Sequence, residues 1–162
     1  MEKIQIIVKN YGSIEIELDS TQAPITVENF LSLVDSHFYD GLTFHRIIDG
    51  FMIQGGDPLG TGTGGSSNKI KGEFKANGIN NTISHVRGVI SMARSQMMDS
   101  ASSQFFIVHK DSTFLDGQYA GFGHVTSGME VVDAICKNTK VIDDNGTVTK
   151  ENQPIIEKIS RI

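Results

Sequence analysis

The stretch that decides the fold class is IQIIVKNYGSIEIEL, residues 4–18, which alternates apolar and other side chains on either side of a short turn. Every second position is apolar in both halves, at Ile4, Ile6, Val8, Ile14, Ile16 and Leu18. A period of two puts alternate side chains on opposite faces of a strand. The intervening Asn10-Tyr11-Gly12 has residue types that favour a turn. The stretch therefore predicts an antiparallel hairpin with one buried and one solvated face.

Two segments have helical periodicity instead. In the first, the apolar residues recur at intervals of three or four, at Val27, Phe30, Leu31 and Val34. Pro24 suits the first turn of this helix, Thr26 and Asn29 are its expected capping residues, and the sequence HFYDG at 37–41 ends it. The second helix is predicted over 129–138, after a glycine and with an apolar face turned inward.

The rest of the chain consists of short apolar runs separated by glycine-rich loops. The runs predict six more strands, at 43–48, 51–55, 88–92, 104–109, 121–125 and 157–162. A parallel sheet would need a helix at each crossover, and too few helical segments exist. The prediction is a mainly β fold, an eight-stranded antiparallel closed β-barrel capped by two α-helices, because closure removes exposed strand edges. No linker or repeat interrupts residues 1–162, so one domain is expected.

Composition and charge narrow the functional classes. Fourteen Lys and Arg residues stand against 19 Asp and Glu residues, which gives a net charge of −5 and argues against binding along a phosphate backbone. No apolar run approaches the length of a membrane-spanning helix, and the N-terminus lacks a signal-peptide pattern. One cysteine rules out a disulfide framework. We therefore expect a soluble, cytoplasmic monomer with no nucleic-acid or membrane partner.

Several short motifs match known binding patterns only in part. The sequence GTGTGG at 60–65 matches a dinucleotide fingerprint, but neither a strand directly before it nor a helix after it is predicted, so a flexible or tightly turning loop is favoured. The sequence DDNG at 143–146 lacks the ligand spacing of a calcium loop and predicts a turn. The histidines show no metal-binding spacing, and Cys136 is expected to pack inward. No metal or other cofactor is therefore expected.

An ordered set of motifs covers most of the chain. They are FHRII at 44–48, FMIQGGD at 51–57, SMAR at 91–94, SQFFI at 103–107, FLDG at 114–117 and FGHV at 122–125. This set closely resembles the cyclophilins, the cyclosporin-binding peptidyl-prolyl cis/trans isomerases, and its compact loops are similar to those of the bacterial cytosolic branch. The resemblance implies an eight-stranded barrel closed by two helices, in agreement with the periodicity, and an active groove on the outer face of the barrel.

The resemblance also assigns roles to single positions. It makes Arg46 the catalytic arginine and puts Gly62 beside a neighbouring pocket. The proline pocket is implied to consist of Phe51, Met52, Phe106 and Leu115. Gln54 and Gln104 are implied to be the polar positions beside it, and Ala93 and Arg94 to lie where backbone groups pair with the bound peptide.

A lone arginine suits this reaction on physical grounds. Rotation about an X–Pro bond is slow because amide resonance is lost in the twisted state, which imposes a barrier of about 18–20 kcal/mol. The prolyl nitrogen regains a lone pair only in that twisted state. A guanidinium that donates to this nitrogen therefore binds the transition state more strongly than the planar ground state. Neither a nucleophile nor an acid–base pair is required.

Strand alternation separates groove residues from core residues. Phe105 and Phe106 should point to opposite faces of one strand, so one can fill the barrel and the other the groove. The same reasoning opposes Phe51 to Met52, and Arg46 to Ile47. Gln54 and Gln104 are expected to act mostly by orienting Arg46.

The chain departs from the family pattern at three positions. Phe114 stands where the family often has Trp, which removes an N–H donor, so weaker cyclosporin binding with retained catalysis is expected. Tyr119 stands where a histidine is common and could keep an aromatic wall with a hydroxyl. Arg94 replaces a frequent Asn, and its added charge is expected to favour acidic residues before the substrate proline.

The sequence thus indicates a peptidyl-prolyl isomerase that acts on proline-containing peptides and unfolded chains without a cofactor. Two rivals stay open at this level. In one, the groove only binds proline segments of a partner, although the intact Arg46, Gln54 and Phe106 speak against a degenerate site. In the other, the protein is a general holdase, for which the net negative charge and the absence of a disordered arm give no support.

Overall fold

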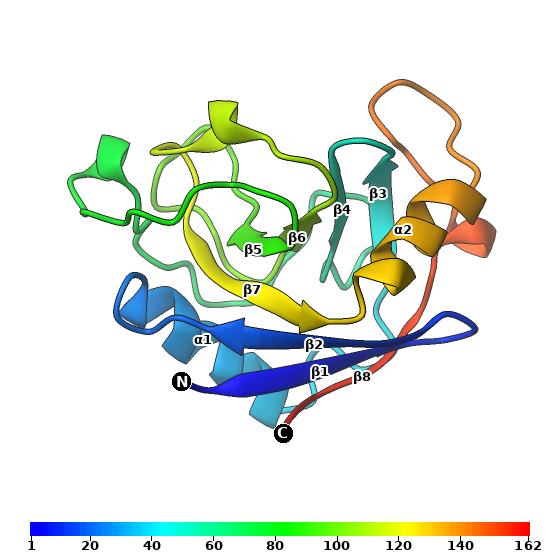
Figure 1. Cartoon of the computed structure of the whole chain (residues 1–162), viewed down its shortest axis with the longest axis horizontal. Coiled ribbons are helices and arrows are strands. Elements are labelled where there is room, and N and C mark those ends of the chain that lie inside the picture. Colours follow the sequence, from blue (N-terminus) through cyan, green and yellow to red (C-terminus); the bar gives the residue numbers. More distant parts are fainter.

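The computed structural model describes all residues, 1–162, and contains one antiparallel sheet with two main helices (Figure 1). The strands follow the spatial order β3-β4-β6-β5-β7-β2-β1-β8. Their bounds are β1 Lys3–Val8, β2 Gly12–Leu18, β3 Phe44–Ile48, β4 Met52–Gly55, β5 Val89–Met92, β6 Phe105–Val108, β7 Gly121–Ser127 and β8 Ile156–Arg161. All strand pairings are antiparallel. The predicted mainly β fold with eight antiparallel strands is confirmed.

The two outer strands, β3 and β8, meet at one point, so the sheet curls nearly into a barrel. Thr43 and Ile155 form an isolated antiparallel bridge just outside these strands. The Phe44 N–H donates to the Pro154 carbonyl at 3.0 Å, and the Ile156 N–H donates to the Leu42 carbonyl at 2.7 Å. These bonds satisfy backbone groups that would otherwise line exposed edges.

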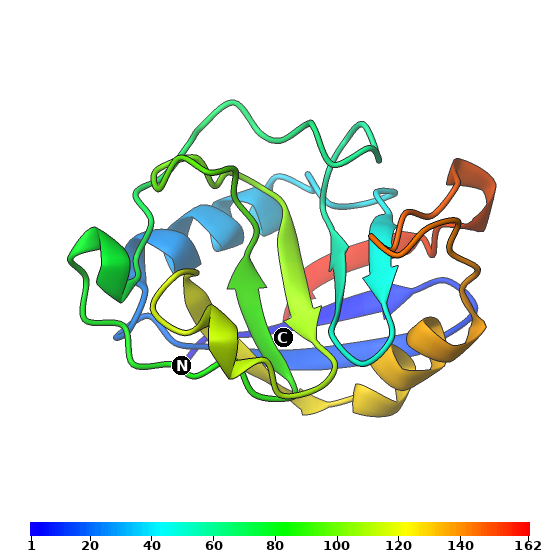
Figure 2. The same ribbon diagram turned by 90° about the horizontal axis from the view of Figure 1, so that it is seen from above.

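The helices α1, Pro24–Asp35, and α2, Met129–Asn138, lie toward opposite ends of the curled sheet (Figure 2). The predicted cap of α1 is wrong, because Ala23 occupies the cap position and no side chain caps it locally. Instead the buried Glu73 carboxylate accepts the Thr26 N–H and hydroxyl, both at 2.7 Å, and so satisfies a free amide of the first turn from 47 residues away. Asn29 donates to the Ser102 carbonyl.

The barrel interior holds a core of 29 buried residues, with an aromatic cluster at its centre. Phe30 of α1 packs against Tyr39, Phe105 and Phe122, with ring centroids 5.1–5.6 Å apart. Cys136 is buried against this core, as predicted, and is unpaired. Single-turn helices at Lys75–Asn77 (η1), Thr113–Leu115 (η2) and Lys150–Asn152 (η3) lie in the loops. Neither α1 nor α2 has the length and apolar character needed to cross a lipid bilayer.

The glycine-rich segment 60–65 is a tight loop organised by one carboxylate. Asp57 is almost fully buried, and its two oxygens accept the N–H groups of residues 59, 61, 62 and 64 at 2.7–3.2 Å. Burial raises the pKa of Asp57, but these four donors outweigh burial and lower the pKa below its usual value. Gly60 and Gly62 have positive φ angles of 65° and 92°, which glycine adopts without steric cost. The predicted tight turning is confirmed.

Candidate active site

Three neighbouring strands place a row of side chains on the outer face of the barrel. Arg46 of β3 is paired in register with Gln54 of β4, and Gln54 is paired with Phe106 of β6. Side chains at directly paired positions project from the same face of a sheet. Ile47 and Phe105, the chain neighbours of this row, belong to the interior core. The predicted opposition of Arg46 to Ile47 and of Phe106 to Phe105 is confirmed.

A cavity of about 120 Å³ opens beside this row. Six of its nine lining residues are hydrophobic. The complete lining is Arg46, Phe51, Met52, Gln54, Ala93, Arg94, Phe106, Leu115 and Tyr119. Beneath it lies a second apolar cluster, separate from the barrel core, which contains Met52, Val89, Phe106, Val108 and Leu115. The fold therefore provides a largely apolar pocket with two arginines, Arg46 and Arg94, on its walls.

The predicted opposition of Phe51 to Met52 is wrong. Both residues line the pocket and pack in the same cluster. The reason is that β4 begins at Met52, whereas Phe51 still belongs to the β3–β4 turn, where strand alternation does not apply.

The Arg46 side chain is held by neutral acceptors. Its Nε donates to the Asn145 carbonyl at 2.8 Å, its Nη2 donates to Asn145 Oδ1 at 3.1 Å, and its Nη1 donates to Gln54 Oε1 at 3.1 Å. No carboxylate forms an ion pair with it. Burial lowers the pKa of Arg46 from its ordinary value, yet a guanidinium stays charged near neutrality. The result is an oriented cation with no carboxylate within ion-pair distance.

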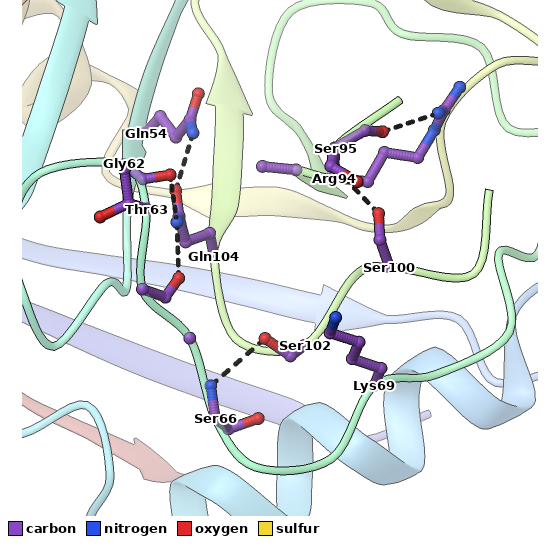
Figure 3. A pocket seen from close by; sticks show the side chains of 13 residues that line it. Gln54, Gly62, Thr63, Ser66, Lys69, Arg94, Ser95, Ser100, Ser102 and Gln104 are labelled. Atoms are coloured by element: carbon purple, nitrogen blue, oxygen red, sulfur yellow. Dashed lines mark hydrogen bonds between the residues drawn. The ribbon is translucent and has the colours of Figure 1, made fainter. Parts of the chain in front are cut away.

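Gln54 links Arg46 to the loop that borders the groove. Gln54 Nε2 donates to Gln104 Oε1 at 3.0 Å, and Gln104 Nε2 donates to the carbonyls of Gly62 and Gly64 at 3.0 and 2.8 Å. Gln104 and Gly62 line a second cavity, of about 300 Å³, which shares Gln54, Ala93 and Arg94 with the apolar pocket (Figure 3). Arg46, two glutamines and the loop thus form one chain of hydrogen bonds.

A buried polar group supports the pocket from below. The His85 ring is completely buried and stacks on Phe106 with centroids 6.0 Å apart. Its Nδ1 lies 3.0 Å from Asp116 Oδ1, and its Nε2 lies 2.8 Å from Ser91 Oγ. Burial lowers the pKa of His85, against the opposing effect of Asp116. A neutral ring that donates from Nδ1 to Asp116 and accepts the Ser91 hydroxyl satisfies all three groups. The order resembles a Ser-His-Asp triad, but Ser91 is fully buried and out of reach of a substrate.

Arg94 and Tyr119 form the far wall of the pocket. The Arg94 guanidinium carbon lies 4.8 Å from the Phe74 ring centroid and 4.9 Å from that of Tyr119. The guanidinium also donates to the backbone carbonyls of residues 95, 96 and 118. The Tyr119 ring meets Phe106 edge-on at 5.9 Å.

Phe114 is the one predicted site residue that lines neither cavity. Its side chain is 72% exposed, and its ring lies 5.5 Å from that of Phe51. It extends the apolar surface at the rim of the pocket.

One cluster outside the groove has potential metal ligands. Ligand atoms of Asp49, His109 and Cys136 lie within 4.8 Å of one another. However, His109 Nδ1 already accepts the Gly50 N–H at 2.9 Å, and burial raises the pKa of Cys136 to about 12, which keeps the thiol protonated. Both effects oppose metal binding.

Comparisons with known proteins all lead to one family. The profile described as "Cyclophilin type peptidyl-prolyl cis-trans isomerase/CLD" matches residues 3–160. The peptidyl-prolyl cis-trans isomerase B of Bacillus subtilis is 46% identical over 145 residues, which are 90% of this chain and 92% of that protein. A Helicobacter pylori peptidyl-prolyl cis-trans isomerase is 46% identical over 128 residues, which are 78% of this chain and 76% of that protein.

A solved structure agrees in three dimensions. The crystal structure of a Cryptosporidium parvum cyclophilin type peptidyl-prolyl cis-trans isomerase, in the presence of the dipeptide Ala-Pro, superimposes with a TM-score of 0.84 at 34% identity. The match covers 98% of this chain and 97% of that one.

Proposed function

The chain belongs to the cyclophilin-type peptidyl-prolyl cis-trans isomerases, and from this premise we propose how its groove accelerates rotation about X–Pro bonds. The substrates are proline-containing peptides and unfolded or partly folded chains. The proline ring occupies the 120 Å³ apolar pocket over Met52, Phe106 and Leu115. The related Cryptosporidium protein, solved in the presence of Ala-Pro, supports a proline peptide as the ligand.

Arg46 supplies the catalytic interaction. When the prolyl amide twists, its nitrogen gains a lone pair that the guanidinium can contact, and this contact does not exist with the planar amide. Acceleration from about 10⁻² to about 10³ per second corresponds to roughly 7 kcal/mol of transition-state stabilisation. A fixed cation in a pocket with apolar walls contributes to this stabilisation, because the walls exclude water from around the guanidinium and the donor is already oriented. No bond to a substrate atom is broken.

The observation that carries this proposal is the state of Arg46 itself. Its side chain stands on the pocket wall and is oriented by two side chains, Asn145 and Gln54, that leave its charge unpaired. An arginine with a purely structural role on a barrel surface would be expected to pair with a carboxylate, as Arg161 does with Asp35 at 2.8 Å.

Exchange spectroscopy by NMR on a proline peptide tests the proposal. We expect Arg46→Ala to lower kcat/KM by about 10²-fold or more while the fold is retained, because a transition-state contact of a few kcal/mol is lost. Arg161→Ala is the matched control and should leave the exchange rate unchanged. Equal rates for wild type and the Arg46 variant would refute the role of the arginine.

Further properties are part of the proposal. Residues 1–162 act as one domain and as a monomer. The single buried, unpaired cysteine is consistent with a cytoplasmic location. Cyclosporin binds with reduced affinity, because Phe114 at the rim offers no N–H donor.

A further inference from the structure

The larger of the two groove cavities is lined by polar and positively charged residues and by no carboxylate. Its volume is about 300 Å³, and only one of its 13 lining residues, Ala93, is hydrophobic. Hydroxyl groups come from Thr63, Ser66 and Ser102 among others, and the charged residues in the lining are Lys69 and Arg94. No Asp or Glu lines it, although the chain as a whole carries a net charge of −5.

Several acceptor groups in this cavity are occupied, and the Ser102 hydroxyl hydrogen is free to donate. Gln104 already donates to the carbonyls of Gly62 and Gly64. The Ser102 hydroxyl oxygen accepts the Ser66 N–H at 3.2 Å, and its own hydrogen has no protein acceptor. A hydroxyl hydrogen that has no protein acceptor can donate to a ligand that only accepts, such as a carboxylate.

Lys69 is the cation that this cavity presents. Figure 3 shows its amine directed toward the space between Ser100 and Ser102. Lys69 takes part in no ion pair. Arg94, which the sequence led us to expect in this role, lines the cavity but holds its guanidinium between Phe74 and Tyr119 and on three backbone carbonyls. It therefore adds positive charge nearby, while Lys69 is free to contact a ligand.

An extended peptide bound along the groove would reach both cavities. Side chains two residues apart in a strand point to the same face, about 6.6 Å from each other. The cavities share Gln54, Ala93 and Arg94, so they are adjacent along the groove. We propose that the polar cavity selects an acidic side chain two residues before the substrate proline, and that Lys69 determines this specificity. The inference rests on the proposed function, since it specifies the substrate of the same groove.

Paired peptides of identical length test it. Ala-Glu-Ala-Pro-Phe and Ala-Gln-Ala-Pro-Phe differ in one charge, and NMR exchange gives kcat/KM for each. Because solvent-exposed ion pairs are weak, we expect wild type to favour the Glu peptide by about three- to fivefold at low ionic strength. Salt at about 0.5 M should reduce the preference toward unity. Lys69→Gln should abolish the preference for the Glu peptide, and Lys69→Glu should reverse it.

The controls distinguish the proposed specificity of Lys69 from the isomerase activity itself. Lys9→Gln, at the β1–β2 turn, should keep the full preference. A peptide with Glu two residues after the proline should gain nothing, and an equal gain there would overturn the placement. A preference that survives in Lys69→Gln, or wild-type rates equal for Glu and Gln, would overturn the inference while leaving isomerase activity intact. Failure of wild type to turn over the Gln peptide would instead count against the proposed function.

Discussion

The hydrogen-bond chain behind Arg46 leads to a quantitative prediction for Gln54. Gln54 accepts from Arg46 Nη1 at 3.1 Å and donates to Gln104 at 3.0 Å, so Gln54→Leu removes both bonds at similar side-chain volume. A hydrogen bond to a charged group contributes about 1.5–3 kcal/mol, and the lower value applies to this half-buried site. The loss of about 1.5 kcal/mol in the transition state corresponds to roughly a tenfold decrease in kcat/KM.

The same series of hydrogen bonds also predicts which of two glutamine substitutions has the larger effect on activity, and that their effects are coupled. Gln104→Leu leaves the Arg46–Gln54 bond in place and releases the Gln54 amide together with the Gly62 and Gly64 carbonyls, none of which contacts Arg46 directly, so its effect on activity should be smaller, about threefold. If both glutamines act through Arg46, Gln104→Leu should cost little further activity in the Gln54→Leu background. Because orientation of the transition state is affected, kcat should fall more than KM rises.

The measurement is NMR exchange with the four proteins of this double-mutant cycle. Gln5→Leu on β1 is a control for general loss of glutamine, because its side chain lies outside the groove. Undiminished kcat/KM in Gln54→Leu would show that Arg46 needs no such support. Fully additive losses in the double variant would refute the relay, since independent sites give additive free energies.

Two other predictions concern His85 and Phe114. Burial lowers the pKa of His85, so as the pH falls below about 6.5 the unfolded chain takes up the proton first and the free energy of unfolding should decrease. Thermal melts from pH 7.5 to 5.5 should therefore show a falling Tm, and the fall in Tm with pH should be shallower in His85→Phe. An equal dependence of Tm on pH in the variant would contradict this role of His85. Phe114→Trp should raise the cyclosporin affinity measured by calorimetry and leave peptide turnover unchanged, because the indole adds an N–H donor at a rim position that is 72% exposed. Equal cyclosporin affinities of wild type and variant would contradict this.

Much of the fold is predictable because its signals are local. The period-two hairpin at 4–18 and the helix at 129–138 appear in the structure within one or two residues of their predicted ends. Strand ends shift where a turn competes, as at Phe51, and there the face assignment fails as well. The cap of α1 fails for a different reason, because Glu73 reaches it from 47 residues away.

The site shows the same division between local and distant signals. Alternation within β3 and β6 separates Arg46 and Phe106 from their core neighbours, and motif resemblance adds the remaining pocket positions. Sequence reasoning misses Asn145 as a partner of Arg46, because the two residues are 99 apart in sequence and residues 143–146 predict only a turn. Asp57 does have a local signal, since an acidic residue before a run of glycines can accept several loop amides.

The placement of these groups follows from what the reaction requires. An enzyme that breaks no bond needs no titrating pair, so the site can be made from a cation, neutral amides and an apolar pocket, and its catalytic power depends on orientation. The rigid β3-β4-β6 face provides that orientation, since register alone aligns Arg46, Gln54 and Phe106. Loops add what the strands cannot supply: Asn145 fixes the second side of the guanidinium, and the Asp57-anchored loop fixes Gln104. Substrate preference can then change through a loop residue such as Lys69 without disturbing the strand face that performs the isomerisation.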